Sequence, residues 1–205
     1  MKVLLINGSP HTKGNTYLAL HEMEEIFSAE GIETQWVQVG NKAVRSCVSC
    51  YHCKEAGKCV FDDIVNETAP AFEEAAGIVV GTPVYFAGAN PALTAFLTRL
   101  FFSVPFDKTM KAGAAVAVAR RGGLTSTFDE LNKFFTISGM AVPGSQYWNG
   151  VHGRLPGEVM QDPEGLQIMR TLARNMSFLM KAIALGKETY GLPEKEERAD
   201  TNFIR

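Results

Sequence analysis

Apolar and polar positions in the first forty residues follow the pattern of a strand, a helix and a second strand. Residues 3–6 are all apolar, which predicts a strand buried on both faces of a sheet. Residues 16–30 place their apolar side chains near one helical face, and Gly31 ends this predicted helix. Residues 33–39 alternate between polar and apolar, so they predict another strand. The chain thus begins by alternating strand and helix.

This alternation continues through most of the chain. Further buried strands are predicted at 77–80, 114–119 and 140–143, and further helices at 64–75, 91–102, 125–138 and 162–186. Strands that alternate with helices favour a parallel sheet with helices on both faces. Five strands in a chain of 205 residues point to the flavodoxin-like order 2-1-3-4-5. We therefore predict an α/β protein with a flavodoxin-like, five-stranded parallel sheet.

The composition fits one α/β domain and argues against several other classes of protein. The 205 residues carry a formal net charge of −2 with scattered Lys and Arg, so no nucleic-acid partner is expected. No apolar run reaches the roughly 18 residues of a membrane span, and the first one is too short for a secretory signal. We predict a cytoplasmic protein with a flavodoxin-like domain over 1–187, a cysteine-rich insertion at 41–63 and a polar tail at 188–205.

The loop after the first strand is polar, lacks acidic residues and leads directly into a helix. Unpaired N–H groups and the positive end of the helix dipole make such a helix start a site for anions. We predict that this loop binds a phosphate group through Ser9, His11, Lys13, Gly14, Asn15 and Thr16. The alternative is an ordinary capped turn that binds nothing. The loop has neither the G-x-x-x-x-G-K-[ST] nor the G-x-G-x-x-G pattern, which argues against a nucleoside triphosphate or a dinucleotide.

Two more loops of unusual composition follow the third and fourth predicted strands. Ligands of such sheets bind beyond the carboxyl ends of the strands, so these loops are expected beside the first one. One loop offers a platform for a planar ring in Pro83, Val84, Tyr85 and Phe86, and the other offers hydrogen-bond donors in Arg120, Arg121, Gly122 and Gly123. The simpler interpretations are aromatics packed on the next helix and a solvated basic turn. A phosphate loop, an aromatic platform and a donor-rich loop together predict FMN as the ligand.

At these motifs the chain resembles the NADPH-dependent FMN reductase and iron–sulfur flavoprotein family. The resemblance rests on the segments 8–16, 81–85 and 120–123, and it extends through 147–149 and 162–165 into the last helix. It implies a multimeric flavodoxin-like enzyme whose first loop holds the FMN phosphate and whose other two loops hold the isoalloxazine ring. Two departures are the segment 95–99, where relatives often carry Asp before the Arg, and His11, where Arg or Lys is common.

All four cysteines fall within residues 47–59, in the pattern C-x2-C-x2-C-x5-C. Cysteines at two-residue spacing can turn their sulfurs toward one centre. The spacing is similar to that of ferredoxins and of iron–sulfur flavoproteins, so we predict a [4Fe–4S] cluster on Cys47, Cys50, Cys53 and Cys59. The alternatives are a zinc ion and a cysteine loop without metal. Structural disulfides are not expected in a reducing compartment.

The predicted cofactor supplies the chemistry, and no side chain is assigned as a catalytic residue, because the sequence shows no nucleophilic triad or metal-hydrolase motif. We predict an FMN-dependent oxidoreductase that passes electrons from a reduced nicotinamide or a protein donor such as ferredoxin to a small acceptor such as a quinone. The alternative is a non-catalytic iron–sulfur/flavin electron carrier or redox sensor. The resemblance implies a homodimer or homotetramer, and we interpret the polar-aromatic segment 147–154 as a subunit contact rather than a flavin cover.

Overall fold

The computed structural model describes residues 1–197, 199–201 and 203, and it confirms the predicted α/β class. Its five strands are β1 (Lys2–Asn7), β2 (Glu33–Gln38), β3 (Gly77–Pro83), β4 (Ala112–Ala119) and β5 (Gly150–His152). They form one parallel sheet in the order β2-β1-β3-β4-β5, which is the predicted flavodoxin-like order. The inner strands β1, β3 and β4 are almost entirely buried, as expected for strands that are covered on both faces.

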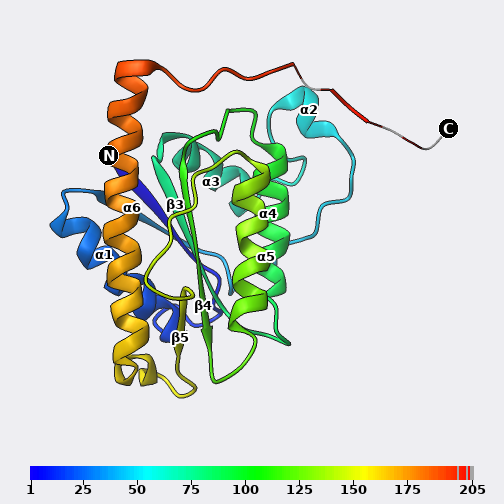
Figure 1. Cartoon of the computed structure of the whole chain (residues 1–205). Helices are drawn as coiled ribbons and strands as arrows, with labels where there is room; N and C mark the ends of the chain where they lie inside the picture. Colours follow the sequence, from blue (N-terminus) through cyan, green and yellow to red (C-terminus); the bar gives the residue numbers. More distant parts are fainter. Residues whose placement is uncertain (198, 202, 204–205) are drawn as a thin grey trace.

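Helices cover both faces of the sheet (Figure 1). One face packs against α1 (Asn15–Ala29) and α6 (Pro163–Tyr190), and the other against α3 (Ile64–Glu74), α4 (Pro91–Ser103) and α5 (Leu124–Ile137). Because successive side chains of a strand point to opposite faces, Leu5 of β1 enters the first core and Leu4 the second. Each core is closed by the apolar stripe of its helices. None of the described helices is both long and apolar enough to cross a membrane.

The long helices lie where the sequence predicts them, and their ends differ by a few residues. The largest difference is at the end of α6, which reaches Tyr190 rather than residue 186. Its start is fixed by Asp162, whose Oδ1 accepts the N–H of Gly165 at 2.9 Å. The predicted boundary between domain and tail at residue 187 therefore falls inside the last turn of this helix.

The prediction of the last strand at residues 140–143 is wrong. The structure forms β5 at Gly150–His152, and Ala141 makes only an isolated bridge to Ala112 at the start of β4. Pro143 has no N–H to donate to a neighbouring strand, so the pairing cannot continue through it. The chain leaves the sheet at this proline and rejoins β4 seven residues later, where Gly150 pairs with Ala117.

The cysteine-rich insertion begins at the carboxyl edge of the sheet, after β2, and its part around α2 (His52–Ala56) lies beside α4, at the far end of the molecule from the loops that follow β1, β3 and β4 (Figure 1). No helix or strand is predicted in this insertion, but it contains the short helix α2. Ser49 and Tyr51, just before α2, both adopt positive φ angles, of 53° and 57°. These two left-handed residues turn the backbone sharply around the second cysteine.

Candidate functional site

Three loops meet at the carboxyl ends of β1, β3 and β4, and we call residues 8–14, 84–90 and 120–123 the carboxyl-edge loops. The N–H of Gly8 donates to the carbonyl of Gly81 at 2.7 Å, and the side-chain amide of Asn90 donates to the carbonyl of Gly8 at 2.8 Å. The N–H of Val84 donates to the carbonyl of Val118 at 2.9 Å. The loops that the sequence singled out therefore lie side by side and are tied together.

The first carboxyl-edge loop presents backbone N–H groups at the start of α1. Gly14 is the N-cap residue, and no side chain of the described residues caps this helix. The N–H groups of Asn15 and Thr16, in its first turn, have no carbonyl of a preceding turn to bind. A Cβ atom at Gly14 would lie 2.9 Å from the Cβ atom of His11, so the tight path of the loop requires glycine. An uncapped helix start of this kind suits an anion.

Ser9 shapes this loop from the inside. It is only 4% exposed, its N–H donates to Oδ1 of Asn7 at 3.0 Å, and its Oγ accepts the N–H of His11 at 3.1 Å. Gln38 at the end of β2 donates to the Ser9 carbonyl at 2.6 Å. Ser9 therefore holds the loop in shape, while His11 and Lys13 are exposed and carry its polar and charged groups.

Asn15 joins the first loop to a segment near the end of the sheet. Its Nδ2 donates to the carbonyl of Leu155 at 2.9 Å, and its Oδ1 accepts the N–H of Gly157 at 2.9 Å. A cavity of about 460 Å³ opens between the two segments, with Lys13 on one side and Arg154 on the other. Arg154 therefore places a positive charge beside the predicted phosphate loop. The sequence did not predict a role for Arg154 at this loop. The one feature of the sequence that could have pointed to Arg154 is that it is a basic residue located after the last strand.

Residues 85–88 form a tight turn that projects from the second carboxyl-edge loop. The N–H groups of Tyr85 and Gly88 donate to each other's carbonyls at 2.9 and 3.0 Å. Phe86 and Ala87 at the tip have positive φ angles of 51° and 60°, which is uncommon for residues with a side chain. Phe86 is fully exposed and Tyr85 is 41% exposed. Both rings are therefore available to a planar ligand or to another protein surface.

The third carboxyl-edge loop packs directly against this turn. Gly123, the N-cap residue of α5, has a φ of 87°, and a Cβ atom there would lie only 2.8 Å from Cα of Ala87. Ser126 Oγ adds a hydrogen bond to the Ala87 carbonyl at 2.6 Å. Glycine thus allows the two loops to touch, and the neighbouring Arg120 and Arg121 remain exposed at the edge.

Further cavities continue from the phosphate loop along the edge of β5. One of about 530 Å³ is lined by Arg120, His152, Arg154 and Asp162, so it shares Arg154 with the phosphate-loop cavity. Glu158 borders it, and its carboxylate accepts the N–H groups of Arg154 and Leu155 at 2.6 and 2.7 Å. These two bonds lower the pKa of Glu158 below its usual value. Arg120 of the third carboxyl-edge loop and Arg154, which lies beside the first loop, thus line the same cavity.

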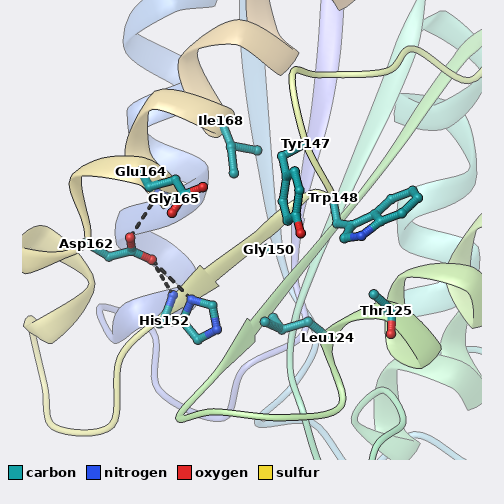
Figure 2. A pocket seen from close by; sticks show the side chains of 10 residues that line it. All are labelled: Leu124, Thr125, Tyr147, Trp148, Gly150, His152, Asp162, Glu164, Gly165 and Ile168. Carbon is teal, nitrogen blue, oxygen red and sulfur yellow. Dashed lines mark hydrogen bonds and ion pairs between the residues drawn. The ribbon is translucent and has the colours of Figure 1, made fainter.

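A smaller cavity of about 110 Å³ lies on the other side of His152 (Figure 2). Tyr147 and Trp148 line one side of it, and Asp162 accepts the main-chain N–H of His152 at 2.7 Å. The segment 147–154 was expected to follow the last strand. It instead contains β5, so Tyr147 and Trp148 precede the strand and Arg154 follows it. Its interpretation as a subunit contact stays a prediction, and the exposed rings of Tyr147 and Trp148 fit it.

All four cysteines line one small cavity beside α4, which we call the cysteine cavity. Cys47 and Cys50 are exposed, and Cys53 and Cys59 are partly buried. Among the described residues no group of three or more potential ligands is placed to hold a single metal ion. The cavity volume of about 20 Å³ suffices for roughly one water molecule. The four thiols are the ligand type that a [4Fe–4S] cluster takes, and all four line this one cavity, so the residues fit such a cluster in kind.

Arg99 of α4 forms part of the wall of the cysteine cavity. Its guanidinium group binds both carboxylate oxygens of Asp63 at 2.7 and 2.9 Å, and its Nε donates to the Sγ atom of Cys59 at 3.2 Å. Burial lowers the pKa of Arg99, but the hydrogen bonds to Asp63 and Cys59 outweigh it and raise the pKa above its usual value. In the sequence Arg99 stands out only as part of the departing segment 95–99, and no role was predicted for it.

Comparison with known proteins agrees with this geometry. The sequence model of the NADPH-dependent FMN reductase family matches residues 1–153, a range that contains all three carboxyl-edge loops and all four cysteines. The fold and these loops define a flavodoxin-like flavoprotein. The chain belongs to the NADPH-dependent FMN reductase family.

Its relatives include proteins that carry an iron–sulfur name. An iron–sulfur flavoprotein of Methanocaldococcus jannaschii is 36% identical over 191 residues, which cover 89% of this chain and 99% of that protein. An iron–sulfur flavoprotein of Methanosarcina thermophila is 29% identical over 193 residues, which cover 92% of this chain and all of that protein.

Solved structures confirm the flavodoxin-like fold at low sequence identity. RosB, solved with a bound formylated riboflavin phosphate, aligns over 100% of this chain and 94% of its own, with a TM-score of 0.70 and 18% identity. An archaeal flavodoxin aligns over 88% of this chain and 99% of its own, with a TM-score of 0.59 and 16% identity.

Proposed function

We propose that this protein is an FMN-dependent oxidoreductase that passes electrons from a reduced nicotinamide or a protein donor to a small acceptor such as a quinone. The observation that carries the proposal is the junction of the carboxyl-edge loops. An uncapped helix start, exposed aromatic rings and exposed guanidinium groups lie side by side there. FMN has a phosphate, a planar ring and a polar ring edge, so its parts match the three loops. Membership of the FMN reductase family supports the same cofactor.

In this proposal each carboxyl-edge loop binds one part of FMN. The N–H groups at the start of α1 hold the phosphate, Ser9 keeps their loop in shape, and Lys13 and Arg154 add positive charge. The ring lies against Pro83, Val84, Tyr85 and Phe86, and its polar edge faces Arg120, Arg121, Gly122 and Gly123. Bound FMN supplies the redox chemistry, since flavins exchange hydride or electrons. The guanidinium groups favour the negatively charged, reduced ring electrostatically.

We further propose that Cys47, Cys50, Cys53 and Cys59 hold a [4Fe–4S] cluster that exchanges single electrons. The support is the convergence of all four thiols on the cysteine cavity and the names of the relatives. Asn90, at the start of α4, contacts the phosphate loop, and Arg99 is nine residues further along the same helix. At 1.5 Å per residue this is about 14 Å. The two sites therefore share a rigid element but do not touch.

The test begins with protein purified without oxygen. Its absorption spectrum reports flavin and iron–sulfur bands together, and iron and FMN are then quantified chemically. We expect one FMN per chain and steady oxidation of NADPH or NADH when a quinone is added. A protein that binds no FMN contradicts the proposal as a whole. A protein with FMN but without iron contradicts only the cluster, and a simple FMN reductase would remain.

A second candidate function is a non-catalytic electron carrier or redox sensor. One observation favours it: Cys47 and Cys50 are exposed, so a cluster bound there is accessible to a protein partner. A carrier would show no steady oxidation of NADPH or NADH with a quinone, and it would rapidly oxidise reduced ferredoxin. An oxidoreductase would instead show steady oxidation of NADPH or NADH when a quinone is present.

A further inference from the structure

Arg99 is the only charged side chain among the buried residues in the described part of the chain, and it is 1% exposed. Placing a charge away from water is costly unless the charge is paired and its hydrogen bonds are complete. The burial of this charge in the wall of the cysteine cavity therefore requires a physical explanation.

The guanidinium group of Arg99 has a partner for each of its donors. Nη1 donates to Oδ2 of Asp63 at 2.7 Å and to the carbonyl of Arg45 at 3.3 Å. Nη2 donates to Oδ1 of Asp63 at 2.9 Å and to the carbonyl of Phe61 at 3.1 Å. Nε donates to Sγ of Cys59 at 3.2 Å. The guanidinium group has five N–H donors, and the five acceptors named above give each donor a partner.

These partners lie on both sides of the cysteine segment. Arg45 precedes Cys47, while Cys59 and Phe61 stand at the other end. The Phe61 ring also lies 5.1 Å from Cζ of Arg99 and 5.0 Å from Cζ of Arg45, so it packs with both guanidinium groups. Arg99 therefore ties the beginning and the end of the segment to the C-terminal half of α4.

The bond to Cys59 has a different effect from the bonds that tie the chain. A thiolate ligand of an iron–sulfur cluster carries part of the cluster's negative charge, and hydrogen bonds to the sulfurs are one of the factors that set its reduction potential. One-electron reduction forms and breaks no bond, and the added negative charge spreads over the cluster and its thiolates. An N–H donor on one sulfur stabilises the reduced form more than the oxidised form.

We propose that Arg99 is a positioning residue of the cysteine site, which holds both ends of the cysteine segment and raises the reduction potential of the cluster through Nε–H···S contact with Cys59. This inference rests on the proposed function, because it requires the [4Fe–4S] cluster. Lysine cannot replace arginine here, since its single ammonium group lacks the planar set of donors that reaches Asp63 and Cys59 together.

The test uses the holoprotein, prepared without oxygen, and the variant Arg99→Lys. The potential is measured by a titration at controlled potentials in which the reduced cluster is followed by electron paramagnetic resonance. We expect about a tenfold lower ratio of reduced to oxidised cluster at a given potential, which is 59 mV for a one-electron couple. The variant keeps the positive charge, so the shift reports the lost Nε–H···S bond.

A matched control separates the hydrogen bond from the charge. Lys54 lies 4.1 Å over the ring of Phe102, which lines the cysteine cavity, and it is exposed. Lys54→Met removes a positive charge near the cluster without touching Cys59. Its potential should fall by less than that of Arg99→Lys. A fall in Lys54→Met together with an unchanged potential in Arg99→Lys would mean that charge alone sets the potential, and it would overturn the hydrogen-bond half of the proposal.

A second variant covers the case in which Arg99→Lys does not fold. Arg99→Met combined with Asp63→Asn removes the buried ion pair as a unit and leaves no unpaired buried charge. A lower potential, or loss of the cluster while FMN stays bound, supports the proposal in either variant. Unchanged potential and unchanged iron content in both variants overturns it. A wild-type protein without a cluster contradicts the proposed cluster itself, which is a distinguishable failure.

Discussion

The carboxyl-edge loops and the cysteine cavity are two sites built on opposite principles at the two ends of α4. Main-chain groups tie the carboxyl-edge loops together, as the bonds from Gly8 to Gly81 and from Val84 to Val118 show. The cysteine cavity lies in an insertion, and the side chain of Arg99 anchors it. The first site follows from how parallel strands end, whereas the second depends on individual side chains.

This difference determines how each site should respond to substitution. Backbone groups remain in place when a side chain is removed. The binding of FMN by the carboxyl-edge loops should therefore weaken gradually as side chains are removed. A centre held by four thiolates needs each ligand. A single cysteine substitution should therefore abolish binding of the cluster at the cysteine cavity.

Serine in place of any one cysteine should remove the cluster. We expect Cys59→Ser to lose the broad iron–sulfur absorption and to keep the FMN bands, because the two sites do not touch. The control is Ser103→Ala, which changes another residue of the cavity wall and should keep both. Loss of the FMN bands in the cysteine variant would show that the sites are not independent.

The protein should form a homodimer or homotetramer, and the cysteine cavity should lie within electron-transfer range of a flavin in the same or a neighbouring subunit. Phe86, Tyr147 and Trp148 are exposed aromatic rings near the carboxyl edge, and a partner subunit would cover them. Light scattering at micromolar concentration should give at least twice the chain mass of 22.4 kDa. A stable monomer would contradict the predicted oligomer and the interpretation of the segment 147–154 as a subunit contact.

Replacing Asn15 and Thr16 by alanine should weaken FMN binding and leave the fold intact. Asn15 holds the segment with Arg154 against the phosphate loop, and Thr16 stands in the first turn of α1. Each lost hydrogen bond to a charged group costs about 1.5–3 kcal/mol. We therefore expect each of the two substitutions to lower the affinity for FMN by roughly one to two decades in a fluorescence titration.

The control for this double variant is Thr94→Ala. The Thr94 hydroxyl bonds to the carbonyl of Pro91 within α4, away from the phosphate loop. The affinity of the Thr94→Ala variant for FMN should equal that of the unchanged protein. Unchanged affinity in the Asn15 and Thr16 variant as well would mean that the first loop is only a turn.

The smallest effect on FMN binding is expected from a substitution of Glu158. Its carboxylate holds the N–H groups of Arg154 and Leu155, and these bonds lower its pKa from the usual 4.5. A lowered pKa in the folded state stabilises the segment above pH 4.5, and this support is lost as the pH falls through the folded-state pKa. Glu158→Gln should reduce FMN affinity at neutral pH less than the Asn15 and Thr16 variant does, and should flatten the acid dependence measured in the same titration. An equal acid dependence in both proteins would exclude Glu158 as the cause.

Sequence alone predicted the strand order and the three loops because both depend on local pattern. The buried strands read as continuous apolar runs, and topology then brings their carboxyl ends together. Strand β5 escaped prediction because it has three residues, and the more apolar segment around Ala141 lies just before it. Pairing with β4, rather than apolar character, selects the segment that becomes the strand.

The roles of Arg99 and Arg154 could not be predicted for a related reason. Arg99 bonds to Cys59 at a separation of 40 positions, and Arg154 lines a cavity together with residues 10–15. A single arginine in a helix carries no local pattern that reveals such a partner. The cysteine spacing, by contrast, was visible, and it identified the segment although not what anchors it.

The span of α4 between Asn90 and Arg99 also sets a limit on how the gene can change. Asn90 is fixed at one end by the phosphate loop, and Arg99 is fixed nine residues later by Asp63 and Cys59. One inserted residue between them would rotate Arg99 by about 100° around the helix axis and advance it by about 1.5 Å. Insertions and deletions should therefore be tolerated in the tail after α6 and rejected within this stretch of nine residues.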